Sequence, residues 1–280
     1  MPATQARRHP RRERPVLQDR SGWDRYRTVW ALTLTSLLAM LFAGLTATTL
    51  SLWATDPTYT QTNPVVDLAF FALGGVLIAT GFASQIRRPA IAGLQQALLA
   101  LATLSAAGWL GGRVEPLIGP LVLLVAAGPL VVFHPDRERL LAAGPNTSRT
   151  LVAMTAVAAG PAVGYAADML SRARAAGPSC FFGQCVQGDR YAEAAALALA
   201  VVLVALLASL RTPGWLLPAW STGTAAVVLG TASLLWPGEV GAIRGAWAVA
   251  TLVWGGAFIA VAHVDHRAPG GYARRSDEDR

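Results

Sequence analysis

The residues best placed for chemistry are an acidic side chain and an arginine four positions apart, Asp168 and Arg172, at the end of a long apolar run. The dipole disfavours a carboxylate near the C-terminal end of a helix, so Asp168 needs a compensating partner. Arg172 lies one helical turn further on, and a plain ion pair is the simpler interpretation. The alternative is a polar pocket, formed together with Arg113 and Arg190, that opens to the outer face of a membrane.

The only two cysteines, Cys180 and Cys185, occur in the sequence Cys-Phe-Phe-Gly-Gln-Cys. Structural zinc sites use four ligands, and no histidine lies on the same predicted side of the chain. The spacing also differs from the Cys-x-x-Cys of thiol oxidoreductases. We therefore expect a structural disulfide in an outer loop, with a reactive thiol pair as the alternative.

Other sequence patterns identify no catalytic mechanism. The chain has no Walker loop, no Gly-x-Ser-x-Gly elbow and no paired carboxylates in the middle of an apolar run. We accordingly expect no cofactor, no metal and no enzymatic activity. Two groups of histidine and aspartate could hold a metal, although histidine is also favoured at the C-terminal ends of helices; they are His134 with Asp136, and His263 with Asp265 and His266.

The elements that must position these residues are long apolar segments. Charged residues make up only 14% of the chain, against about a quarter in an ordinary soluble domain. Because a hydrocarbon core about 30 Å thick needs about 20 apolar residues per helix, we predict an all-α polytopic bundle of about eight transmembrane helices. Seven spans are the alternative, since the fourth and eighth runs are short. The runs are Val29–Trp53, Val65–Ala83, Ala90–Leu110, Leu117–Phe133, Thr150–Leu170, Tyr191–Leu210, Leu216–Trp236 and Ala246–His263.

The basic residues predict how the helices are oriented. The chain has no lysine and 23 arginines. With a cytoplasmic N-terminus, 18 arginines fall on the cytoplasmic side and 5 on the other, in agreement with the positive-inside rule. Arginines scattered over tails and loops do not form a nucleic-acid-binding face, so we expect no nucleic acid partner. The expected partners are the lipid bilayer and other membrane proteins, with both termini in the cytoplasm.

The same pattern predicts one membrane domain with two tails. Residues 1–28 are basic and contain three prolines, so they cannot bury a core and are expected to be disordered in the cytoplasm. The transmembrane domain covers residues 29–263, and residues 264–280 form a second cytoplasmic tail. The loops between the runs leave no room for a soluble domain.

Two prolines interrupt consecutive runs within the same local sequence, Val-Ala-Ala-Gly-Pro, at 125–129 and 157–161. Counting at about 1.5 Å per residue places Pro129 and Pro161 roughly 16–18 Å into the membrane. Kinked helices at this depth line substrate cavities in transporters, although many proline kinks have no function. Gly160 and Gly164, four residues apart, predict close helix packing.

Three stretches resemble uncharacterised multi-pass membrane proteins of actinobacteria, namely Asp189–Leu197, Gly214–Trp220 and Val253–Gly256. The resemblance implies a bacterial plasma membrane and no particular activity. We therefore expect a non-enzymatic plasma-membrane protein that acts as a scaffold or accessory subunit. The alternatives are a small-molecule or lipid transporter that uses the fourth and fifth helices, and a membrane enzyme with its site on the outer face.

Overall fold

The computed structural model describes residues 20–55, 63–87, 89–142, 144, 147–176 and 186–267, and this part of the chain is helical without β-strands. The predicted all-α class is confirmed there. The helices are α1 (Arg20–Thr55), α2 (Pro64–Phe71), the π-helix η1 (Ala72–Ala79), α3 (Thr80–Arg87), α4 (Ile91–Gly111), α5 (Val114–Val132), the 3₁₀-helix η2 (Arg137–Arg139), α6 (Arg149–Ala175), α7 (Val186–Ser209), α8 (Leu216–Leu235) and α9 (Ala246–Arg267).

Among the described residues, six helical segments are long and apolar enough to cross a membrane, which fits an integral, multi-pass membrane protein. The short fourth and eighth runs, at α5 and α9, are among them. The seventh run forms α8, which is not among them because serine, threonine, glycine and tryptophan dilute its apolar content; the first run lies in α1, whose side chains are described only in part. The six are Pro64–Ile86, Ile91–Gly111, Val114–Val132, Arg149–Ala175, Gly188–Ser209 and Ala246–Arg267.

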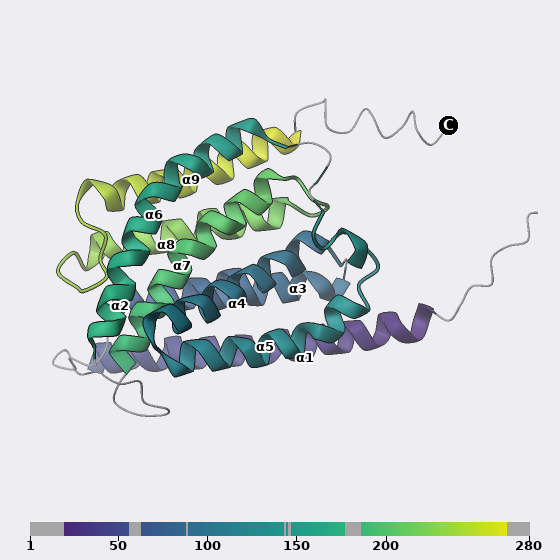
Figure 1. Cartoon of the computed structure of the whole chain (residues 1–280), viewed down its shortest axis with the longest axis horizontal. Helices are drawn as coiled ribbons and strands as arrows, with labels where there is room; N and C mark the ends of the chain where they lie inside the picture. Colours follow the sequence, from purple (N-terminus) through teal and green to yellow (C-terminus); the bar gives the residue numbers. More distant parts are fainter. Residues whose placement is uncertain are drawn as a thin grey trace, which may run out of the picture.

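Helices α4 and α7 pack against each other at the centre of the bundle. In Figure 1, α1 and α5 lie on one side of this centre and α6 and α9 on the other. Most residues of the α4 and α7 spans are buried, whereas only about a fifth of those of α5, α6 and α9 are. The exposed residues include large apolar side chains such as Val122 and Val125 of α5. Outer helices in a bilayer show this pattern because their apolar side chains face hydrocarbon rather than water.

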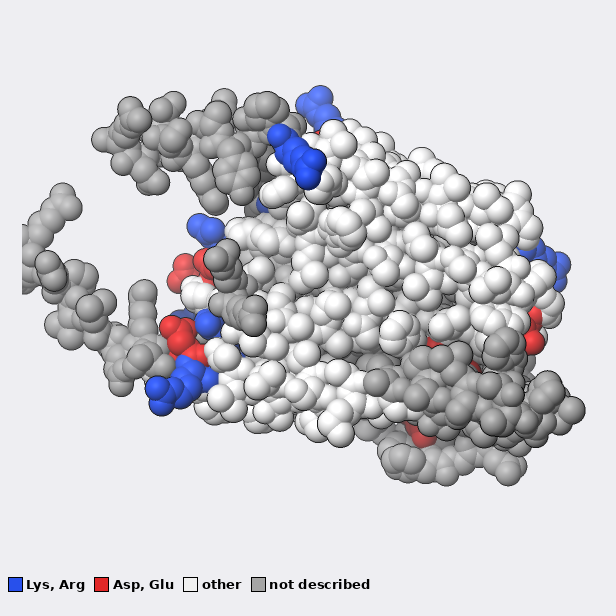
Figure 2. Space-filling model, turned by 180° about the vertical axis from the view of Figure 1, so that it is seen from behind, with Lys and Arg blue, Asp and Glu red and all other residues white. Residues whose placement is uncertain are grey.

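The helices run between two ends of the bundle. The tail end holds the start of α1 and the end of α9, and the loop end holds the α4–α5 and α8–α9 connections (Figure 1). On the face that Figure 2 shows, charged side chains gather at these two ends and leave an uncharged band between them. A band of this kind is expected for the part of the surface that contacts the hydrocarbon core.

Three of the histidine and aspartate residues of the tail end, Asp265, His134 and Asp136, form hydrogen bonds within the protein. Asp265 accepts hydrogen bonds from Ser148 Oγ and Arg211 Nη2, both at 2.6 Å. The backbone N–H of Asp136 donates to His134 Nδ1 at 3.0 Å. Burial lowers the pKa of His134, with Asp136 acting in the opposite direction. Within the described residues, no group of three or more His, Cys, Asp or Glu side chains could hold a metal ion.

Candidate functional site

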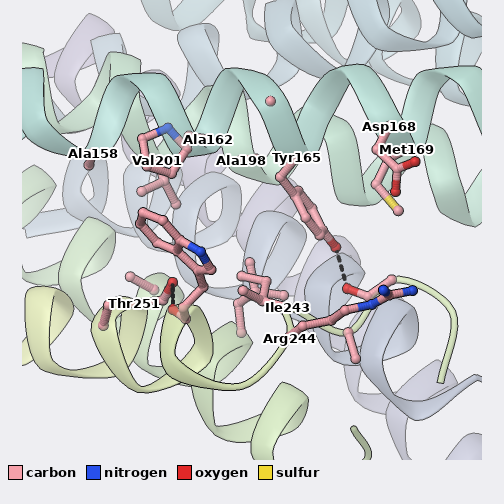
Figure 3. Close-up of a pocket in the computed structure, with 18 of the residues that line it drawn as sticks. Ala158, Ala162, Tyr165, Asp168, Met169, Ala198, Val201, Ile243, Arg244 and Thr251 are labelled. Atoms are coloured by element: carbon pink, nitrogen blue, oxygen red, sulfur yellow. Dashed lines mark hydrogen bonds between the residues drawn. The ribbon is translucent and has the colours of Figure 1, made fainter. Parts of the chain in front are cut away.

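A groove of about 990 Å³ opens between α6, α9 and the loop that joins α8 to α9, residues 236–245 (Figure 3). We call it the α6–α9 groove. Small and apolar residues from four helices form most of its walls, with two tryptophans on the α9 side. The wall residues are Val157, Ala158, Pro161, Ala162 and Gly164 of α6, Ala198 and Val201 of α7, Ala226 and Leu229 of α8, and Trp247, Ala250, Thr251 and Trp254 of α9.

The groove exists because α6 presents its small residues to open space. This helix packs on α7, and its buried residues include Thr155, Met169 and Ala173. The opposite face carries Gly160 and Gly164, and a Cβ added at either glycine would have nothing within 4 Å. The close helix packing predicted for these two glycines is therefore wrong. Gly164 lines the groove instead, and Gly160 is exposed.

Two hydrogen bonds between elements fix the groove's two ends. Toward the tail end, Trp254 Nε1 donates to the carbonyl oxygen of Met154 at 3.0 Å, and the indole stacks on Phe258 with ring centroids 4.9 Å apart. Toward the loop end, Tyr165 Oη donates to the carbonyl oxygen of Gly241 at 2.7 Å, as Figure 3 shows. These two contacts join α6 to α9 and to the α8–α9 loop at opposite ends of the groove.

The depth of the groove matches one leaflet of a bilayer. Its α6 wall extends from Asp168 at the mouth to Val157. These residues are 11 positions apart in a continuous helix, which corresponds to about 16 Å. Half of a hydrocarbon core is about 15 Å thick. The length of the groove along α6 is therefore close to the thickness of one leaflet.

Four charged residues line the groove at its mouth: Asp168 and Arg172 of α6, and Glu239 and Arg244 of the α8–α9 loop. Arg172 Nε lies 3.0 Å from Asp168 Oδ2, so the ion pair that the spacing predicts is present. The side chains of both partners are about half exposed, at 43% for Arg172 and 52% for Asp168. A pair this exposed contributes little to stability, so its position at the mouth matters more than its energy.

Hydrogen bonds from three other segments hold the backbone of the α8–α9 loop. Asn63 Nδ2 donates to the Val240 carbonyl oxygen at 2.7 Å, and the Ile243 backbone N–H donates to Ser233 Oγ at 3.0 Å. Between them, Gly241 accepts the bond from Tyr165 and has a φ of +94°, a conformation that favours glycine. The loop therefore presents Glu239 and Arg244 to the mouth from a fixed backbone.

The other two arginines of the predicted polar pocket lie in ion pairs outside the groove. Arg113 donates through Nε to the carbonyl oxygen of Ala173 at 3.0 Å, and the same nitrogen is 3.8 Å from Asp189 Oδ1. Arg113 and Asp189 are 2% and 3% exposed, which leaves them unavailable to a ligand in the groove. This pair instead connects the α4–α5 turn to α6 and α7.

Arg190 forms the second ion-pair cluster, which is partly buried. Its Nη1 is 2.9 Å from Glu193 Oε2, and its Nε is 3.4 Å from Asp67 Oδ1. The guanidinium also lies over the ring of Phe70, 4.3 Å from the centroid. These contacts join α2 to α7. The helix begins before the apolar run that starts at Tyr191, because α7 begins at Val186 and its first turn contains Asp189.

The structure separates the two predicted kinks. Pro161 lies near the middle of α6 and lines the groove, whereas Pro129 lies in the last turn of α5. Helix α5 packs on α4, and α6 packs on α7 and α9, so the two prolines do not share a wall. Cys180 and Cys185 lie outside the described residues, and their disulfide stays a prediction.

Sequence reasoning missed the residues that complete the groove, namely Tyr165, Glu239, Arg244, Trp247 and Trp254. Their only sequence signal is that charged and aromatic residues recur near the predicted outer ends of helices, where interfacial residues are common. Comparison with family models, with curated proteins and with solved structures gives no match. Inference about function must therefore start from the groove itself.

Proposed function

We propose that this chain is a non-enzymatic integral membrane protein that binds an amphiphile in the α6–α9 groove, as a lipid-binding scaffold or accessory subunit. The depth of the groove carries the proposal. Apolar walls extend about 16 Å from a charged mouth, the length of one leaflet, so an acyl chain fits inside while a polar headgroup stays at the membrane surface. The volume of about 990 Å³ is at the upper end of the range for small-molecule sites, roughly 300–1,000 Å³.

Binding accounts for this geometry better than transport does. A transport pathway would continue from one membrane face to the other, with polar groups near the middle. The deep walls of the groove are instead mainly alanine, valine and proline, and the hydroxyl of Thr251 donates to the Trp247 carbonyl oxygen of its own helix. The Trp254–Met154 hydrogen bond joins α6 to α9 at that depth. An acyl chain that moves from the hydrocarbon of the bilayer into the groove gains little free energy, because both surroundings are apolar. Close packing in the groove and contacts with the headgroup therefore supply the affinity.

Filling the groove should remove the bound amphiphile. We expect Gly164→Trp to abolish copurification of lipid with the detergent-purified protein, measured by mass spectrometry, because the indole would occupy the open space beside Gly164. Gly160→Trp is the matched control: it adds the same side chain one turn away on an exposed surface outside the groove. Retention of the same lipid by the Gly164→Trp protein, folded and at normal yield, would contradict the proposal.

We further propose that α1 and α8 cross the membrane beside the six apolar segments, giving eight spans in a bacterial plasma membrane. The tail end then faces the cytoplasm and the groove opens in the outer leaflet. The arginine distribution supports this orientation, with 18 arginines on the tail side and 5 on the loop side.

Cysteine labelling tests the orientation. In a background with Cys180→Ser and Cys185→Ser, we expect Gly238→Cys at the loop end to react with an impermeant maleimide in intact cells. Leu141→Cys at the tail end, where the native side chain is 97% exposed, should react only after permeabilisation. Labelling of Leu141→Cys in intact cells would reverse the topology.

A further inference from the structure

The charges at the mouth of the α6–α9 groove balance. Asp168, Arg172, Glu239 and Arg244 together have a formal charge of zero. Arg172 and Asp168 are paired with each other at 3.0 Å. Glu239 and Arg244 are exposed, and neither side chain has a hydrogen bond or ion pair with another residue in the described part of the chain. The mouth therefore offers one carboxylate and one guanidinium that are available to a ligand.

We propose that the groove binds a phospholipid whose headgroup contains both a phosphate and a primary ammonium group. This assignment rests on the proposed function, because it identifies the amphiphile of the same groove. The phosphate lies at Arg244, at the mouth that Arg172 also lines, and the ammonium lies at Glu239. The acyl chains extend from this headgroup along the apolar walls toward Val157 and Trp254.

Each half of the headgroup matches one free side chain. A guanidinium presents its N–H groups in a planar fork that suits two phosphate oxygens. A primary ammonium has three N–H donors, and an ionised carboxylate accepts several hydrogen bonds. Since Glu239 and Arg244 belong to the same fixed loop, both halves of one headgroup are contacted by a single structural element. In Figure 3, Arg244 and Asp168 lie at the same end of the groove.

The balance of charge argues against the other common headgroups. An anionic phospholipid without an amine would satisfy Arg244 but bring its negative charge to a mouth that already holds two carboxylates. A choline headgroup keeps the positive charge but has no N–H group to donate to Glu239. A fatty acid or diacylglycerol lacks the ammonium altogether and leaves Glu239 without a cation.

Lipid competition tests the assignment. Purified protein in detergent would be given equal amounts of phosphatidylethanolamine, phosphatidylglycerol, phosphatidylcholine and diacylglycerol with identical acyl chains, and the bound species counted by native mass spectrometry. We expect phosphatidylethanolamine to be preferred by about tenfold, the effect of one charge-assisted hydrogen bond. Glu239→Gln should reduce its preference over phosphatidylcholine to near unity. Arg244→Gln should weaken all three phospholipids relative to diacylglycerol.

The controls are exposed charged residues at the tail end, away from the groove. Glu138→Gln and Arg149→Gln change the net charge by the same amounts as Glu239→Gln and Arg244→Gln. They should leave the order of preference among the lipids unchanged. Equal binding of the three phospholipids, or preference for phosphatidylglycerol, would overturn the headgroup assignment and leave amphiphile binding intact. Lipid binding that Gly164→Trp does not reduce would instead overturn the proposed function of the groove itself.

Discussion

Replacement of Arg113 by methionine is expected to lower the free energy of unfolding by about 3–5 kcal/mol, the usual effect of removing one partner from a buried ion pair. The guanidinium is 2% exposed, donates to the Ala173 carbonyl oxygen and lies 3.8 Å from the Asp189 carboxylate, itself 3% exposed. Methionine fills similar space but leaves a buried carboxylate without this cation. Thermal unfolding and denaturant titration of the detergent-purified protein would measure the loss.

A second substitution separates charge from packing. In the Arg113→Met/Asp189→Asn double variant both charges are gone, so we expect much of the lost stability to return. Arg174→Met is the comparison at an exposed arginine of the same end, whose Nε donates to the Leu110 carbonyl oxygen at 2.6 Å. It should cost under about 1 kcal/mol. Equal losses for Arg113→Met and Arg174→Met would mean that burial of the pair has no energetic consequence.

The same ion pairs explain where sequence reasoning about the helices fails. Long apolar runs are sufficient to predict helices in a membrane, because the backbone has no other way to satisfy its polar groups. The start of α7 is not predictable in this way. Asp189 and Arg190 suggest a polar loop before Tyr191, yet both lie inside the helix, neutralised by Arg113 and by Asp67 from distant segments. Local sequence contains no information about those partners.

The candidate site shows the same division between local and distant information. Asp168 and Arg172 are four residues apart on one helix, so their ion pair follows from helical geometry. The groove beside them depends on a bond between Tyr165 and Gly241, which are 76 residues apart. It also depends on which face of α6 contacts α7. The spacing of Gly160 and Gly164 in the sequence does not show whether a neighbouring helix packs on that face.

Neighbouring glycines of α9 give the sharpest test of helix packing in this bundle. A Cβ at Gly255 would lie 2.5 Å from the carbonyl oxygen of Gly223 in α8, and a Cβ at Gly223 would lie 2.6 Å from that of Gly255. At Gly256, a Cβ would meet nothing within 4 Å. The backbones of α8 and α9 are therefore in direct contact at Gly255 and not at Gly256. Small residues permit such close crossings of membrane helices.

We expect Gly255→Ala to lower the free energy of unfolding by about 1–3 kcal/mol, because a methyl group there overlaps backbone atoms that cannot rotate away. Gly256→Ala should be neutral or stabilising by up to about 1 kcal/mol, since alanine favours a helix more than glycine does. Thermal unfolding of both variants checks this, and equal effects would contradict the close crossing.

The α8–α9 crossing also positions Trp254, the residue before Gly255, in the groove wall. Gly255→Ala should therefore reduce both lipid copurification and the free energy of unfolding, whereas Gly256→Ala should reduce neither.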